Sequence, residues 1–237
     1  MKSIKRLFAL IFLLVASTAC AAEPDVSDTL KKSFPKLTFE TISPTPINGM
    51  YEVIAGNNVF YIDPVSGHMI FGEMWSPTGV NITAAAKDRM MSSKYASIRQ
   101  KLLAAIKIGS GPNEIIEISD PDCPFCRKMH EYWNKRTDVT RYVFLMPLTQ
   151  LHPQAKIKSD YILSSKDPAA ALDEIASGKF DKTSLPTIVL DDARIKAQTD
   201  SLISGINGTP AYFVNGAFVN GANVPQIEKL LTKGAVR

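Results

Sequence analysis

Cysteine and histidine are scarce in this 237-residue chain, which contains three of each. Cys20 falls in a leader-like stretch at the N-terminus, so Cys123 and Cys126 can pair only with each other or with another molecule. Structural zinc normally needs four Cys or His ligands, which makes a zinc site a poor explanation for two cysteines. A two-residue loop between cysteines restrains little of the unfolded chain, which disfavours an inert structural disulfide. We therefore expect no metal and no organic cofactor.

A strong excess of one charge and long hydrophobic runs are also missing from most of the chain. The formal net charge is +4, but residues 1–21 contain three basic residues and no acidic one, so the remainder is nearly balanced. This balance disfavours a nucleic-acid partner. After residue 21 no apolar stretch is long and uninterrupted enough to predict a membrane span.

The first 21 residues have the features of an export signal. Three basic residues precede the apolar run 7–15, which is too short to cross a bilayer comfortably, and Ala19-Cys20-Ala21 supplies small residues at the spacing of a cleavage site. The alternative is a bacterial lipoprotein with its lipid on Cys20, but the leucine usual three positions earlier is absent. Export would place Cys123 and Cys126 in an oxidising compartment.

The sequence Cys123-Pro124-Phe125-Cys126 is the main candidate for chemistry. The β-branched run 114–119 before it predicts a strand, and apolar residues at helical spacing after it predict a helix that begins near Cys123. The free N–H groups and the dipole at a helix N-terminus stabilise a thiolate. We therefore predict that Cys123 is the nucleophile. Cys126, one turn further along and more covered by the helix, would be the resolving thiol.

Residues 22–83 predict a small N-terminal domain. A short helix over residues 27–34 is followed by strand-like runs with turn signals between them. Such a meander has too thin a core to fold easily alone. The strand-like runs are residues 37–42, 50–55, 59–62 and 68–74.

Residues 84–107 contain no Gly or Pro and carry apolar residues every three or four positions, which predicts one continuous helix. Such a helix would be about 36 Å long. A core helix and a rigid connector between two domains fit this pattern equally well. The sequence Gly109-Ser110-Gly111-Pro112 predicts a break after it, so we assign residues 84–108 to a linker helix.

Residues 109–237 predict a catalytic domain. The order of strand, helix, strand, helical segment, hairpin and helix is that of a thioredoxin fold with a helical insertion at about residues 150–204. The fold class is therefore a two-domain α+β protein. The expected elements after the CxxC helix are a strand over 141–146, helices within 154–204, strands 211–214 and 217–219, and a final helix over 225–233.

In a thioredoxin fold, the loop before the hairpin approaches the CxxC pair, and here this loop contains Thr209-Pro210. Proline removes most of the cost of a cis peptide bond, so we predict a cis bond here rather than a plain trans turn. A cis bend would expose the backbone of Thr209 as an edge to which an extended substrate can add. The predicted substrate contacts are Pro124, Phe125, Thr209 and Pro210.

These features together resemble the periplasmic disulfide-bond isomerases of the DsbC/DsbG family, within the thioredoxin superfamily. The resemblance covers nearly all residues after the leader, including Gly72-Glu73-Met74, Cys123 to Glu131 and Gly208-Thr209-Pro210-Ala211. It implies that residues 22–83 form a cystatin-like dimerisation domain, so that two chains face each other across an apolar cleft. It also implies isomerisation of incorrect disulfides in misfolded exported proteins, with a membrane reductase of the DsbD kind as electron donor.

The chain departs from this family in two places. Family members often carry a second cysteine pair in the helical insertion, whereas this chain has Leu163-Ser164-Ser165 there, so we expect a less constrained insertion. The dipeptide Pro124-Phe125 replaces the Gly-Tyr of the isomerase type and the Pro-Tyr of the DsbG type, and these residues tune the reduction potential. Three alternatives therefore stay open: a DsbG-like reductase that protects single thiols, a DsbA-like oxidase, and a dimeric holdase chaperone without enzyme activity.

Overall fold

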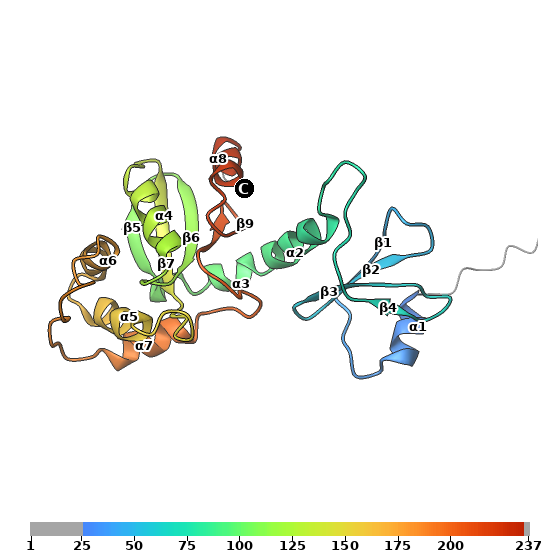
Figure 1. Cartoon of the computed structure of the whole chain (residues 1–237), viewed down its shortest axis with the longest axis horizontal. Helices are drawn as coiled ribbons and strands as arrows, with labels where there is room; N and C mark the ends of the chain where they lie inside the picture. The colour runs from blue at the N-terminus through green and yellow to red at the C-terminus, as the bar shows by residue number, and fades with distance from the viewer. Residues whose placement is uncertain (1–25, 235–237) are drawn as a thin grey trace, which may run out of the picture.

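The computed structural model describes residues 26–234, in two units that each contain one β-sheet (Figure 1). The predicted signal segment 1–21, with Cys20, lies outside the described residues. Within them, no helix is both long and apolar enough to cross a membrane.

The N-terminal unit is a four-stranded antiparallel sheet in the order β1-β2-β3-β4, with α1 (Val26–Ser33) packed on it. Leu30 of α1 is fully buried against Val53 and Phe60 of the sheet. The predicted meander is therefore confirmed, although its first strand lies further along the chain than the predicted 37–42 and its last is shorter than the predicted 68–74. The strands are β1 (Thr41–Pro44), β2 (Tyr51–Ala55), β3 (Asn58–Ile62) and β4 (Met69–Ile70).

The prediction of one helix over residues 84–107 is wrong beyond Ser93. The chain forms α2 (Ile82–Ser93), α3 (Tyr95–Arg99), a 3-10 turn η1 (Leu102–Ala104) and then the strand β5 (Ile106–Gly109). Ile106 and Ile108 have β-branched side chains, and they pair with β7 (Val139–Leu145) at the edge of the second sheet. Strand pairing with a distant segment therefore overrides the local helical pattern, and the second sheet starts before the predicted boundary at residue 109.

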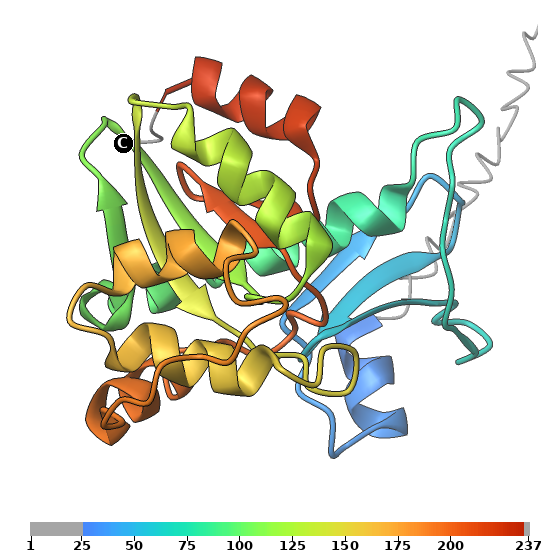
Figure 2. The ribbon, with the colours of Figure 1, turned by 60° about the vertical axis from the view of Figure 1, so that its left-hand side comes forward.

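The second unit has a five-stranded mixed sheet in the order β5-β7-β6-β8-β9 (Figure 2). The central strand β6 runs parallel to β7 and antiparallel to β8. Helices α4 and α8 cover one face of the sheet through a cluster that includes Met129, Trp133 and Ile227. The bounds are β6 (Asn113–Ser119), α4 (Pro124–Asn134), β7 (Val139–Leu145), β8 (Ala211–Val214), β9 (Ala217–Asn220) and α8 (Val224–Thr232).

The insertion between β7 and β8 contains three helices, α5 (Ala155–Ser164), α6 (Pro168–Ala176) and α7 (Asp192–Thr199). They pack beside β5 and β7, where Ile162 and Leu172 are buried with Val143. The predicted helical stretch is thus interrupted, because residues 177–191 form neither helix nor strand.

Helix α2 joins the two units, and it is also part of a shared hydrophobic core (Figure 1). Met90 and Met91 of α2 lie in one buried cluster with Ile54 of the first sheet and Phe213 of the second. The helix is therefore a connector and a core helix at once. The two-domain α+β organisation predicted from the sequence is confirmed.

Replacement of Gly111 by alanine tests the close packing between the start of β6 and the turn before β7. A Cβ atom at position 111 would lie 2.1 Å from the backbone carbon of Asp138, so backbone must move. We expect a loss of about 1–3 kcal/mol in the free energy of unfolding, and a melting temperature lower by several degrees. Gly72→Ala is the control, since nothing lies within 4 Å of its added Cβ. Equal melting temperatures for the two variants would contradict this packing.

Candidate active site

Cys123 is the N-cap residue of α4, and Pro124 is the first residue of that helix. Proline suits this position, because its fixed φ is helical and the N–H it lacks would have no helical partner. The N–H of Cys123 donates to the Asp120 carbonyl at 3.1 Å, and the Cys123 carbonyl accepts the N–H of Arg127 at 3.1 Å. The predicted placement of Cys123 at a helix N-terminus is confirmed.

The loop before β8 brings its backbone to this cysteine. The Thr209–Pro210 peptide bond is cis, as predicted. The Cys123 thiol donates to the Thr209 carbonyl, with an Sγ–O distance of 3.4 Å. Two motifs 86 residues apart in sequence therefore meet in space. Pro124 and Phe125 lie on the surface beside them, and 62% of Phe125 is exposed.

Cys126 lies one turn into α4 and is a free thiol, like Cys123. The N–H of Asp120 donates to its sulfur at 3.4 Å. Burial raises the pKa of the Cys126 thiol far above its ordinary value of 9.0, although the Asp120 N–H acts in the opposite direction. Both cysteines are buried to a similar degree, so the expected greater cover of Cys126 is not seen in exposure. The two thiols differ in their contacts: Cys123 donates to the Thr209 carbonyl, whereas Cys126 accepts the N–H of Asp120.

Asp120 fixes the loop that leads into the CxxC motif, and sequence reasoning missed this role. Its carboxylate is fully buried. One oxygen accepts the N–H of Asp122 at 2.8 Å, and the other accepts the N–H of Leu148 at 2.7 Å and contacts Nδ1 of His152 at 3.1 Å. The sequence Asp120-Pro121-Asp122 signals only the end of a strand, because the partners at 148 and 152 come from the segment after β7.

Four charged side chains tie the helical insertion to this loop. Arg127 binds Asp122 at 3.0 Å and binds both oxygens of Asp181 at 2.5 and 2.7 Å. Lys158 of α5 contacts the same two carboxylates, at 3.3 Å for Asp181. The hydrogen bond from Arg127 lowers the pKa of Asp181 to about 2. These ion pairs hold a segment that we expected to be less constrained because it lacks a second cysteine pair.

A second group of charged and polar side chains is buried where α4 meets β6 and β7. Arg141 and Glu117 are each 1% exposed and are joined by two hydrogen bonds of 2.8 and 3.1 Å. Arg141 also donates to Nδ1 of His130 at 3.3 Å. Since Nδ1 accepts this bond, Nε2 carries the hydrogen and donates to Asp173 at 2.5 Å.

His130 is therefore not a solvated helix residue: its side chain is buried, and both of its ring nitrogens have protein partners. The predicted role of Cys123 and Cys126 does not depend on a metal. Across residues 26–234, no group of three or more His, Cys, Asp or Glu side chains is arranged to hold a metal ion.

Comparisons with known proteins agree with the two-unit organisation. A family model described as the disulfide bond isomerase protein N-terminal domain matches residues 17–84, and one described as a thioredoxin-like domain matches residues 103–235. The chain is 27% identical over 232 residues to the thiol:disulfide interchange protein DsbC of Escherichia coli (strain K12), with 94% of this chain and 93% of that protein covered.

Two further relatives have similar descriptions. The thiol:disulfide interchange protein DsbC of Salmonella typhimurium is 26% identical over 224 residues, with 91% of this chain and 90% of that protein covered. The crystal structure of a disulfide interchange protein from Neisseria gonorrhoeae is 32% identical, covers 56% of this chain and 96% of that one, and has a TM-score of 0.48.

The raised pKa of Cys126 predicts how the stability of the dithiol form depends on pH. Above pH 9 the unfolded chain releases the Cys126 proton while the folded chain keeps it, so the free energy of unfolding falls as pH rises. We expect Cys126 to account for about 1 kcal/mol of the loss between pH 9 and pH 10. Urea unfolding of the reduced protein at pH 8, 9 and 10 measures it. Cys126→Ala should flatten this slope, and an unchanged slope would contradict the assignment.

The ion pairs of Asp181 predict how easily residues 177–191 are cleaved. In Asp181→Asn the charge that binds Arg127 and Lys158 is lost, so this segment should open more often. We expect limited trypsin digestion after Lys179 and Lys182 to become several-fold faster, as measured by mass spectrometry. Asp160→Asn is the matched control, because among residues 26–234 the ion-pair partner of Asp160 is Lys156 of the same helix, α5. Equal cleavage in both variants would show that the ion pairs do not hold the segment.

Proposed function

Because this chain belongs to the DsbC family of thiol:disulfide interchange proteins, we propose that it uses Cys123 and Cys126 to correct wrong disulfides in exported proteins. It is a thiol–disulfide oxidoreductase of the disulfide isomerase type. The observation that carries the assignment of residues is the 3.4 Å contact between the Cys123 sulfur and the Thr209 carbonyl. This contact supports the proposal that Cys123 is the nucleophile and that the Thr209 backbone is the edge along which substrate lies.

The reaction begins when the Cys123 thiolate attacks one sulfur of a substrate disulfide. The substrate S–S bond breaks, its other sulfur leaves as a thiolate, and a mixed disulfide joins Cys123 to the substrate. In isomerisation, a different substrate thiolate attacks the substrate sulfur of this mixed disulfide and releases Cys123 as a thiolate. In reduction, the sulfur of Cys126 attacks that of Cys123 instead, which leaves a Cys123–Cys126 disulfide and a reduced substrate.

The environment of Cys126 supports isomerisation over reduction. Burial raises the pKa of Cys126, so at neutral pH it remains a thiol, and a thiol is a poor nucleophile. The mixed disulfide on Cys123 then lasts long enough for a second substrate thiol to attack it. Cys126 acts as a slow release route for substrates that do not rearrange.

The surface around Cys123 suits an extended polypeptide. Thr209 offers backbone next to the reacting sulfur, and Pro210 fixes the bend that presents it. Pro124 and Phe125, which follow Cys123 in the chain, are both exposed. We assign these four residues to substrate contact.

The N-terminal unit supports a homodimer. Phe71, Trp75 and Val80 expose 68%, 58% and 57% of their surface beyond the short strand β4. Several large apolar side chains exposed near one another mark a protein interface. We assign residues 22–83 to dimerisation, 84–108 to the connection and 109–237 to catalysis. A periplasmic location, after removal of residues 1–21, and electron supply by a membrane reductase of the DsbD kind complete the proposal.

Recovery of activity from scrambled ribonuclease tests the proposed function. We expect the reduced wild type to restore ribonuclease activity, and Cys123→Ser to lose at least 100-fold in rate because no mixed disulfide forms. Cys126→Ser should retain part of the isomerase activity and accumulate mixed disulfides, seen on non-reducing gels.

The same variants separate the alternatives. A holdase would suppress aggregation of a reduced substrate equally well with Cys123→Ser and would not need the thiol at all. An oxidase would instead form disulfides in reduced ribonuclease faster than it rearranges scrambled ribonuclease. If the reduced wild type failed to restore activity, the isomerase assignment would be wrong.

A further inference from the structure

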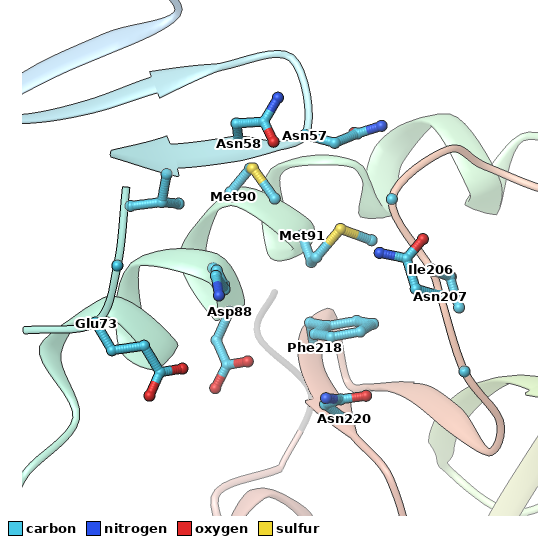
Figure 3. A pocket seen from close by; sticks show the side chains of 15 residues that line it. Asn57, Asn58, Glu73, Asp88, Met90, Met91, Ile206, Asn207, Phe218 and Asn220 are labelled. Carbon is cyan, nitrogen blue, oxygen red and sulfur yellow. The ribbon is translucent and has the colours of Figure 1, made fainter. Parts of the chain in front are cut away.

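A cavity of about 630 Å³ lies where the N-terminal sheet, α2 and the loop before β8 meet (Figure 3). Pockets that bind ligands have volumes of roughly 300–1,000 Å³. Its walls come from both units of the chain, and the assigned chemistry of Cys123 and Cys126 uses none of them. The lining includes Asn57 in the turn after β2, Asn58 at the start of β3, Met90 and Met91 of α2, residues 205–208, and Asn220 at the end of β9.

One wall of the cavity is an unpaired stretch of backbone. In the part of the chain that the structure describes, neither the N–H nor the C=O groups of residues 206–208 have a hydrogen-bond partner. No atom lies within 4 Å of the point where a Cβ on Gly208 would sit, so another chain can approach this backbone closely. Free backbone donors and acceptors of this kind are what an extended peptide pairs with when it adds as a strand.

This stretch leads directly to the reacting sulfur. Residues 206–208 precede Thr209, whose carbonyl contacts the Cys123 thiol. An extended chain rises about 3.3 Å per residue, so three residues span about 10 Å. A peptide held by its own cysteine at Cys123, and lying along this backbone, would reach the cavity three or four residues from that cysteine.

The walls of the cavity are held in position. The Lys94 ammonium donates to Asn57 at 2.5 Å and to the Ser204 carbonyl at 3.1 Å, which fastens the turn after β2 to the loop before β8. Gly205 has a φ of +93°, and a Cβ there would lie 2.8 Å from the Asn57 side-chain oxygen. Only glycine therefore permits this close approach of the N-terminal unit to the loop.

The lining suits polypeptide of varied sequence. Asn58 and Asn220 line the cavity with amide groups, and amides donate to and accept from peptide groups equally well (Figure 3). Met90 and Met91 also line the cavity, and methionine adapts its shape to different apolar neighbours. Glu73 and Asp88 lie near each other at one end and would repel an acidic side chain.

We propose that this cavity binds an extended, non-acidic segment of an unfolded substrate polypeptide, three to four residues from the cysteine bonded to Cys123. The inference rests on the proposed function and adds a substrate subsite to it. The N-terminal unit thereby contacts substrate within the same chain, in addition to its assigned role in dimerisation.

Photo-cross-linking from a trapped peptide tests this subsite. The probe is a peptide whose single cysteine carries thionitrobenzoate as a mixed disulfide, with benzoylphenylalanine four residues before or after that cysteine. In the Cys126→Ser protein, the Cys123 thiolate attacks the peptide sulfur and thionitrobenzoate leaves as a coloured anion, so the peptide stays attached. After irradiation, mass spectrometry should find cross-links from at least one of the two peptides to residues 57–59 or 205–208.

The possible outcomes separate the two proposals. Cross-links confined to the groove between α4 and α8, around Phe125 and Val224, would overturn the subsite and leave the proposed function intact. If no thionitrobenzoate were released, the assignment of Cys123 as the nucleophile would be wrong, and the proposed subsite would be contradicted as well.

A variant that fills the cavity gives a second measurement. Asn58→Trp should raise KM for scrambled ribonuclease about fivefold. Its reaction with a small aromatic disulfide, which tests only the chemistry of Cys123, should change much less. Asn48→Trp is the matched control, since Asn48 is also an exposed asparagine of the N-terminal unit but lies in the turn before β2 and does not line the cavity. Equal KM values for both variants, or an equal loss with both substrates, would contradict the subsite.

Discussion

The antiparallel pairing of β6 with β8 is the constraint on which the active site depends. Ile118 pairs with Ala211, so the end of β6 and the start of β8 meet at one edge of the sheet. The CxxC motif follows β6 and the Thr209–Pro210 bond precedes β8, so this pairing alone brings them to the same place. The parallel neighbour β7 ends at this edge too, and it delivers Leu148 and His152 to the carboxylate of Asp120. Strand register therefore sets the distance between Cys123 and Thr209.

At this edge of the sheet, ion pairs rather than a second disulfide hold the helical insertion against α4. Asp120 holds the loop before Cys123, while Asp122 and Asp181 hold Arg127 and Lys158 around the first turn of α4. A buried charge that loses its partner costs several kcal/mol, so such groups favour a single arrangement. The outcome is a dithiol with two different thiols. Cys123 lies at the helix start beside the Thr209 carbonyl, and burial keeps Cys126, one turn further along, protonated.

The N-terminal unit is more than an attachment to a catalytic domain. Its sheet shares a buried core with the second sheet through Met90 and Met91 of α2, and its turn after β2 touches the loop that leads to Thr209. Membership of the DsbC family explains why such a unit is present. The shared core explains why its position relative to Cys123 is defined, which a flexible linker would not achieve.

Local signals in the sequence determined the chemistry of this protein. A β-branched run, a Cys-Pro-Phe-Cys segment and a Thr-Pro before a strand predicted a nucleophile at a helix start and a cis bond beside it, because strand, helix and proline preferences act over a few residues. The tertiary structure decided those features that depend on contacts between residues far apart in the sequence. Ile106 and Ile108 became a strand only because β7 offers an edge, and the charges around Asp122 are in contact only because the insertion folds back onto α4. Contacts across 20 to 50 residues leave no periodic trace in a single sequence, since each partner alone is an ordinary charged or apolar residue.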